Sequence, residues 1–329
     1  MNVLVTGGAG FIGSVTVDAL LSQGYEVAIV DNLSRGHRGS VPEGVPFYHG
    51  DVADVELIER ILDERDVDAC IHFAANAYPG ESVTEPAMYF DNNLRKSLVL
   101  LEIFRRRKMN KLVFSSTCAA FGEPEYLPID EKHPQRPPSP YGWSKMVFER
   151  ALESYDRAYG FKFVALRYFN ACGATMDKGE DHEPETHLLP LILWTAMGRR
   201  KVLKIFGTDY PTPDGTCIRD YVHVSDLAQA HLRALDYLNN GGESDVFNLG
   251  NGNGFSVKEC IAAVERVTGL PVSVEDAERR PGDASHLVAD SAKAASVLGW
   301  QPKITSMDDI IESSWEWFKA NPDGYDDGA

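Results

Sequence analysis

The chain has 329 residues, of which 43% are hydrophobic and 25% are charged, and its formal net charge is −17. This composition is typical of a globular protein with a full core and predicts one large or two medium domains. The negative charge excludes a broad electrostatic attraction to nucleic acid or to an anionic membrane. Solubility or a salty cytoplasm explains the acidity, so we infer no function from it.

No run of the sequence reaches the roughly 18 consecutive apolar residues that a membrane span needs, and no signal-peptide pattern opens the chain. We therefore expect a cytoplasmic protein. The five cysteines are scattered and form no C-x-x-C pair: Cys70, Cys118, Cys172, Cys217 and Cys260. This spacing predicts reduced thiols, with neither a disulfide framework nor a metal site.

Short β-branched runs alternate with helical patterns through the first half of the chain. The sequence predicts strands in 2–8, 25–31, 46–52, 68–75, 110–117 and 161–170. Helices are predicted over 11–23 and 92–107 and after Pro140. About seven strands precede Gly173 in this interpretation. Such an alternation is typical of a parallel sheet with helices on its faces.

After Gly173 the alternation ends in segments rich in proline, glycine and acidic residues, such as EDHEPETHLLPLI. We therefore expect an α/β protein with a Rossmann-type, doubly wound parallel sheet in residues 1–172. A smaller α/β domain is expected in 173–329. A helical pattern at about 220–238 is expected to return to the first domain.

A glycine-rich turn lies between the first predicted strand and the first predicted helix. Gly7, Gly10 and Gly13 form the pattern G-x-x-G-x-x-G there, where bare backbone lets a pyrophosphate approach a helix N-terminus. Three glycines could also serve only a tight corner, so the spacing alone is weak. Asp31 ends the second predicted strand, where a carboxylate accepts the ribose hydroxyls of adenosine and repels a 2′-phosphate. The combination predicts NAD rather than NADP.

Two further strand ends extend the predicted cofactor site. Asp51 closes the third strand and is expected to reach the adenine ring; an ordinary helix N-cap is the alternative. Phe73, Ala74 and Ala75 end the fourth strand beside the expected phosphates.

A candidate for the chemistry is the pair Tyr141 and Lys145, which are spaced i,i+4 and would share one face of a helix. This spacing is poor evidence by itself, but Thr117 ends a predicted strand at the sheet edge where active sites gather. A tyrosine acts as a base near neutral pH only if its pKa of about 10 is lowered. Lys145 and an oxidised nicotinamide would supply the positive charge that does so.

These residues occur within the blocks VTGGAGFIG, SPYGWSK, LRYFNACGA and IFGTDYPTPDGTCIRDYVHV. Together the blocks resemble the extended short-chain dehydrogenase/reductase family and, more narrowly, the UDP-glucose 4-epimerases. The resemblance covers nearly the whole chain. It implies an isomerase with tightly bound NAD, a UDP-sugar bound by the smaller domain, and a homodimer that pairs the helices at 92–107 and 143–159.

The resemblance also implies a mechanism. Tyr141 would take the proton from the hydroxyl on carbon 4 while hydride passes to NAD, and Thr117 would hydrogen-bond the sugar. The resulting 4-keto sugar would turn over and be reduced on its opposite face, without net oxidation. Beside the residues already named, the family pattern assigns Phe11, Ile12, Asn32, Val52, Asn92 and Phe169 to the cofactor. For the nucleotide sugar it indicates Asn170, His187, Leu188, Phe206, Arg219, Arg280, Asp283 and Leu287.

Several assignments keep an alternative. Arg219 and Arg280 suit a diphosphate, although surface ion pairing also explains arginines in an acidic chain. His187 replaces an asparagine of other members and is either a substrate contact or structural. Ala77 replaces a lysine of some members, which leaves the pyrophosphate to backbone N–H groups and Arg35.

Other activities also remain open. Leu287 stands where a large residue restricts the family to plain hexoses and a small one admits N-acetylated sugars, so UDP-N-acetylglucosamine or a UDP-pentose is an alternative substrate. A dehydratase needs further acid and base groups after Thr117, where this chain has Cys118 and Ala119. A reductase would release its cofactor, and a catalytically silent nucleotide-sugar sensor would not need Tyr141.

Overall fold

The main sheet has seven strands in the order β10-β6-β5-β4-β1-β2-β3, and each neighbouring pair is parallel. The computed structural model describes residues 1–280 and 282–327. The strands are β1 (Asn2–Thr6), β2 (Glu26–Asp31), β3 (Phe47–His49), β4 (Ala69–His72), β5 (Lys111–Thr117), β6 (Lys162–Tyr168) and β10 (Asp245–Leu249). Strand order reverses direction between β1 and β4, which is the crevice where such sheets bind ligands. The predicted Rossmann-type sheet is confirmed.

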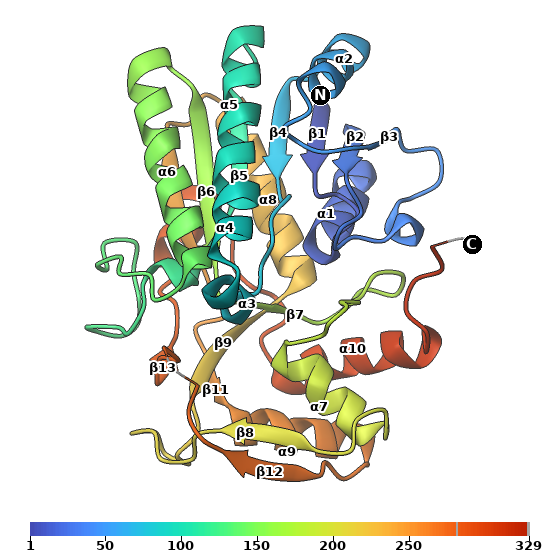
Figure 1. The fold of residues 1–329 in the computed structure, drawn as a ribbon, viewed down its shortest axis with the longest axis vertical. Helices are drawn as coiled ribbons and strands as arrows, with labels where there is room; N and C mark the ends of the chain where they lie inside the picture. Colours follow the sequence, from blue (N-terminus) through green and yellow to red (C-terminus); the bar gives the residue numbers. More distant parts are fainter. Residues whose placement is uncertain (281, 328–329) are drawn as a thin grey trace.

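Helices cover both faces of this sheet (Figure 1). One face is covered by α1 (Phe11–Ser22) and α8 (Val224–Asn239), which pack against each other. The other face is covered by α2 (Val55–Arg65), α5 (Lys96–Arg107) and α6 (Pro140–Tyr159). Because both faces are buried, β1 and β4 read as continuous apolar runs rather than alternating ones.

The predicted elements differ from the structure at two places. The helix expected over 92–107 is preceded by α3 (Pro79–Thr84) and α4 (Pro86–Tyr89), runs through a π-helical turn, η2 (Phe90–Arg95), and only then becomes α5. The strand expected over 161–170 divides: β6 stays in the main sheet, whereas β7 (Asn170–Cys172) pairs with β9 (Ile218–His223) in a second sheet. A β-branched run predicts extended backbone but not which sheet it joins.

The smaller part of the molecule lies beyond the carboxyl ends of the main strands, toward which the strand arrows point (Figure 1). Its second sheet is built around β9, which pairs with β7, β11 and β13, and a separate pair joins β8 to β12. Its core contains Ile192, Val264, Ile310 and Trp317. Its remaining elements are α7 (Leu188–Ala196), β8 (Leu203–Phe206), β11 (Gly254–Ser256), α9 (Val257–Thr268), β12 (Val274–Ala277), β13 (His286–Leu287) and α10 (Met307–Ala320). The short η4 (Ala294–Leu298) packs instead on α8 and β10 of the first part.

The two parts are not separated by one cut in the chain. After β9, the chain enters α8 on the main sheet and then β10 at its edge, before returning to β11. The division at 172 stays a prediction, and residues 224–249 lie with the first part in space. No helix in the described ranges is long and apolar enough to cross a membrane.

Candidate active site

A cavity of about 740 Å³ lies at the carboxyl edge of the main sheet and is lined by both parts of the molecule. Every residue that the sequence analysis assigned to cofactor, sugar nucleotide or chemistry lines it. The cofactor group is Gly7, Gly10, Phe11, Ile12, Gly13, Asp31, Asn32, Asp51, Val52, Phe73, Ala74, Ala75, Asn92 and Phe169, with Tyr141 and Lys145. The sugar-nucleotide group is Thr117, Asn170, His187, Leu188, Phe206, Arg219, Arg280, Asp283 and Leu287. Residues that lie as far apart in the sequence as Gly7 and Leu287 therefore line one cavity.

The glycine-rich turn requires its glycines. Gly7 has φ +71°, and a Cβ there would lie 2.5 Å from the backbone nitrogen of Ala74. A Cβ on Gly13 would lie 2.1 Å from the carbonyl oxygen of Gly7. Gly10 is the N-cap of α1 and offers no side-chain cap, so the N–H groups of the first turn stay available beside the cavity. The turn fits a pyrophosphate held by backbone donors.

The two carboxylates at neighbouring strand ends fit the adenosine half of a dinucleotide. Asp31 is 7% exposed and accepts hydrogen bonds from the backbone N–H groups of Ala9, at 3.0 Å, and Leu33, at 2.8 Å. Burial raises the pKa of Asp31, and these hydrogen bonds oppose that shift. Asp51 forms an ion pair with Lys96. The N-cap of α2 is Asp54, so the alternative reading of Asp51 as that N-cap is wrong.

Thr117, Tyr141 and Lys145 come from two adjoining elements. Thr117 ends β5, and Tyr141 lies in the first turn of α6, whose start is fixed by the Ser139 cap and by Pro140. Lys145 lies one turn further and donates from Nζ to the carbonyl oxygen of Ser115 at 2.9 Å. Tyr141 and Lys145 are almost fully buried. The predicted hydroxyl, phenol and ammonium groups thus meet at one end of the cavity.

The electrostatics of this end differ from the expectation. Burial raises the pKa of Tyr141 to about 12, opposed by a hydrogen bond with Thr117. Burial lowers the pKa of Lys145 to about 7, opposed by the charge of Glu149. Lys145 was expected to depress the pKa of Tyr141, but its ammonium is directed at the Ser115 carbonyl, and burial dominates. A phenolate here needs further positive charge in the cavity, which fits an oxidised nicotinamide.

The cavity lining also presents two guanidinium groups. Arg219 lies in β9, in register with Leu287 of β13. Arg280 forms an ion pair with Asp283 at 2.9 Å, and its guanidinium lies 4.8 Å from the ring centroid of Phe206. Arg280 therefore forms an ion pair, as the alternative interpretation expected. It also lines the cavity, where its guanidinium suits a diphosphate.

Arg35 and Ala77 also line the cavity, near the glycine-rich turn. Arg35 forms a two-pronged contact with Glu81, at 2.8 and 3.1 Å, and its guanidinium lies 4.8 Å from the ring centroid of Tyr78. Arg35 is the cation expected to support the pyrophosphate in place of the lysine that Ala77 replaces. Its guanidinium is held in position by a carboxylate and an aromatic ring.

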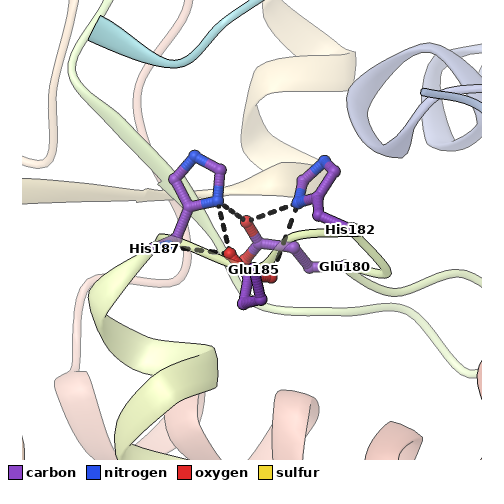
Figure 2. A group of neighbouring side chains, drawn as sticks. All are labelled: Glu180, His182, Glu185 and His187. Carbon is purple, nitrogen blue, oxygen red and sulfur yellow. Dashed lines mark hydrogen bonds and ion pairs between the residues drawn. The ribbon is translucent and has the colours of Figure 1, made fainter. Parts of the chain in front are cut away.

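Two histidines and two glutamates that no predicted motif contained form a cluster at the cavity wall, which Figure 2 shows. Glu180, His182 and His187 line the cavity, and Glu185 is buried behind them. His187 Nδ1 lies 2.7 Å from Glu180 and 2.9 Å from Glu185, while His182 Nδ1 lies 3.3 Å and 3.5 Å from them. Burial disfavours charge on both rings, but the two carboxylates outweigh it and raise the pKa of His182 to about 9 and of His187 to about 10. The spacing E-x-H-x-x-E-x-H in the sequence was the signal from which this cluster could have been predicted.

A Rossmann-type sheet with a Tyr-x-x-x-Lys pair at its carboxyl edge defines an NAD-binding protein of the short-chain dehydrogenase/reductase class. The profile of the NAD dependent epimerase/dehydratase family matches residues 3–250. The chain belongs to this family, as its resemblance implied.

Individual relatives match over nearly their whole length. The UDP-glucose 4-epimerase of Streptococcus mutans is 51% identical over 331 residues, covering 99% of both chains. The crystal structure of UDP-glucose 4-epimerase from Brucella ovis in complex with NAD has a TM-score of 0.93 at 46% identity, covering 96% of this chain and 98% of that one. The Bifidobacterium longum enzyme in complex with NAD⁺ and UDP has a TM-score of 0.93 at 40% identity, covering 99% of this chain and 100% of that one.

Proposed function

We propose that this protein is an NAD-dependent isomerase that interconverts UDP-galactose and UDP-glucose through a transient 4-keto sugar. The observation that carries the proposal is the arrangement of the cavity. Thr117, Tyr141 and Lys145 line the same cavity as a glycine-rich turn suited to a dinucleotide and two arginines suited to a diphosphate. Relatives with the same full-length match are UDP-glucose 4-epimerases.

NAD, when bound, supplies the oxidation and subsequent reduction of the sugar at carbon 4. The Tyr141 phenolate accepts the proton of the hydroxyl on that carbon and later returns it to the same oxygen, so no proton is lost in the cycle. The Thr117 hydroxyl hydrogen-bonds this oxygen and fixes its position. Arg219 and Arg280 hold the diphosphate while the 4-keto sugar turns within the cavity and presents its other face.

A dehydratase is the nearest competing activity, because it would use the same fold, cofactor and tyrosine. It needs an additional acid and base next to Thr117. The residues there are Cys118 and Ala119, and burial raises the pKa of the Cys118 thiol to about 12. Neither residue transfers protons at neutral pH, which favours epimerisation.

The decisive variant is Tyr141→Phe, which removes the proposed base and keeps the ring. We expect kcat for UDP-galactose to fall by about 10²–10⁴-fold, since general acid–base catalysis typically contributes that much. The control is Tyr159→Phe at the end of the same helix, where the side chain is 59% exposed. Undiminished turnover by Tyr141→Phe would exclude the proposed mechanism.

Tight retention of NAD separates an epimerase from a simple reductase, because the epimerase reoxidises its own cofactor in each cycle. We expect supernatant from heat-denatured protein, purified without added NAD, to contain about one NAD per chain. Protein that yields no NAD would favour the reductase.

We also propose a homodimer and a cytoplasmic location. Exposed apolar side chains lie on α4, η2 and the first half of α6: Met88, Phe90, Trp143 and Val147. Such a patch suits burial against a second copy. Sedimentation equilibrium is expected to give twice the chain mass of 36.4 kDa. The five free cysteines suit a reducing compartment, which cell fractionation tests.

A further inference from the structure

The cluster of Glu180, His182, Glu185 and His187 has the form of a metal site. One ligand atom from each residue lies within 4.8 Å of the others. Both imidazoles turn Nδ1 toward the carboxylates, as Figure 2 shows, so that two nitrogens and two oxygens converge. The cluster is not used by the mechanism above, which needs no ion.

The separations of the His182 donor come close to those around a tetrahedral ion. Bonds of about 2.0–2.2 Å to histidine nitrogen and carboxylate oxygen place tetrahedral donors about 3.3–3.6 Å apart. His182 Nδ1 lies 3.3 Å from Glu180 and 3.5 Å from Glu185. His187 Nδ1 lies at hydrogen-bond distance, 2.7 and 2.9 Å, from the same two carboxylates, so a bound ion would move this ring outward by about 0.5 Å. Two imidazoles and two carboxylates form a donor set of borderline softness, which suits zinc better than calcium or magnesium.

A second observation points to a missing partner. His182 Nδ1 and Glu185 Oε2 are buried and form no hydrogen bond among the described residues, although they lie 3.5 Å apart as an ion pair. The Glu185 side chain is 0% exposed and that of Glu180 is 6% exposed. Buried polar atoms normally have a partner, and a coordinated ion between the four residues would supply one to both.

We propose that Glu180, His182, Glu185 and His187 bind one divalent cation of the zinc type. The ion displaces one Nδ1 proton from each imidazole, so two positive charges leave as two arrive, and the charge of the cluster is unchanged. Four protein ligands make a closed, structural site rather than one that binds a reacting group. This inference departs from the expectation of no metal site, which rested on cysteine spacing alone.

The ion would fasten the segment that contains its ligands. That segment already contacts the first part of the molecule, where Arg35 donates to the Glu183 carbonyl at 2.9 Å and His37 lies 3.0 Å from the Asp181 carbonyl oxygen. It also contacts the C-terminal tail, since the Tyr325 N–H donates to Asp181 at 2.9 Å. His187 is the N-cap of α7 and lines the cavity. The ion is therefore a positioning element for the cavity wall.

The first test is metal analysis of the holoenzyme, purified without a histidine tag, dialysed against micromolar Zn²⁺ and then against metal-free buffer. We expect about one zinc per chain in the unaltered protein and below about 0.1 in His182→Gln and Glu185→Gln. The matched control is His37→Gln, which removes a histidine that pairs with Asp181 in the same segment but is no ligand. It is expected to keep its zinc.

A second measurement uses the unaltered protein, so it does not depend on the folding of a variant. Titration with Co²⁺ is expected to give the visible absorption of a tetrahedral site, saturating at about one equivalent. An unaltered protein that takes up neither Zn²⁺ nor Co²⁺ would overturn the proposal, and so would His182→Gln with its full zinc content. The cluster would then be a pair of histidine–glutamate ion bridges only.

A consequence for activity rests on the proposed epimerase function. Stripping the ion with a chelator is expected to raise KM for UDP-galactose severalfold, with kcat and bound NAD unchanged, because the ion holds the wall and not the reacting groups. The measurement of metal content does not depend on an activity assay. A protein that binds zinc and lacks epimerase activity would therefore contradict the proposed function alone.

Discussion

Tyr141 and Lys145 have pKa values that work against each other near neutral pH. Tyr141 needs to lose a proton from a group whose pKa burial raises to about 12, while Lys145 keeps its proton only below about 7. The combination of phenolate and ammonium is therefore rare in the empty cavity. The positive charge of an oxidised nicotinamide favours the phenolate, so the proposed base is expected to form when the cofactor is bound.

Leu287 is a single residue that we expect to govern the choice of sugar. It lines the cavity from β13 and packs beside Phe121 and Phe169. Leu287→Tyr adds bulk where an N-acetyl group would lie. We expect the ratio of kcat/KM for UDP-N-acetylglucosamine to that for UDP-galactose to fall by about 10-fold or more. Leu287→Met, of nearly equal volume, is the control. An unchanged ratio in Leu287→Tyr would contradict the role of this residue.

Residues whose role depends on local sequence were predictable, and those whose role depends on distant contacts were not. Gly7, Asp31 and Tyr141 lie at strand ends or helix starts that the pattern predicts, and parallel strands bring such ends to one edge. The cluster around Glu185 needs a loop folded back on itself, which periodicity does not report. The pKa of Lys145 depends on its burial, which no motif specifies.

At the scale of elements, one buried ion pair joins a helix to the main sheet. The Glu149 carboxylate of α6 accepts hydrogen bonds from Nε of Arg167 in β6, at 3.0 and 3.2 Å, and from the Ser116 hydroxyl of β5. The two ion-paired side chains are 0% and 3% exposed. The pair holds α6, and with it Tyr141, at a fixed height over β5.

Glu149→Gln keeps the shape of this side chain and leaves the Arg167 guanidinium buried without its counter-charge. We expect the free energy of unfolding to fall by about 3–5 kcal/mol, measured by urea denaturation, because an uncompensated buried charge is costly. Glu153→Gln in the same helix breaks the exposed pair with Arg150 and is expected to cost less than about 1 kcal/mol. Equal effects of the two variants would contradict the argument.

The order of elements was more predictable than their pairing. The alternation of strand and helix patterns up to Tyr168 predicts a parallel sheet, because parallel strands need crossovers. The edge strand β10 follows some 75 residues after the first part of the chain, beyond α8. Its sequence, DVFNL, predicts a strand but contains nothing that selects the edge of β6 over another sheet. That selection depends on tertiary packing.

At the scale of the whole molecule, the chain crosses between its two parts several times, and the cavity lies where it crosses. Three buried histidines lie on the two sides of this crossing: His72 in β4 and His231 in α8 belong to the first part, and His223 ends β9 in the second sheet. Burial lowers the pKa of His72 to about 3 and those of His223 and His231 to about 4. The folded protein therefore keeps all three neutral where an unfolded chain protonates them.

This difference predicts acid sensitivity with a defined sign. As pH falls below about 6.5, each of these histidines binds a proton in the unfolded chain but not in the folded protein. Each one therefore lowers the free energy of unfolding by up to about 1.4 kcal/mol per pH unit, until the pH reaches its pKa in the folded protein. Above about 6.5 both states hold these histidines neutral, and the effect vanishes. Carboxylates with a raised pKa, such as Asp220 at about 6, instead raise the free energy of unfolding as pH falls, because the folded chain binds their protons first. The contribution of one histidine is therefore obtained by comparing the protein with a variant that lacks it.

His231→Leu isolates that effect, because the ring packs beside Phe73 and Tyr168 and its one hydrogen bond within the described ranges runs from Nδ1 to the Leu227 carbonyl at 2.8 Å. Urea unfolding of the holoenzyme between pH 6 and 4.5 is expected to show a slope against pH that is shallower in the variant by about 1 kcal/mol per unit. Between pH 7 and 8 the two slopes are expected to coincide, which serves as the internal control. Parallel slopes at acidic pH would mean that His231 is protonated in the folded protein, and that this histidine does not contribute to the acid sensitivity.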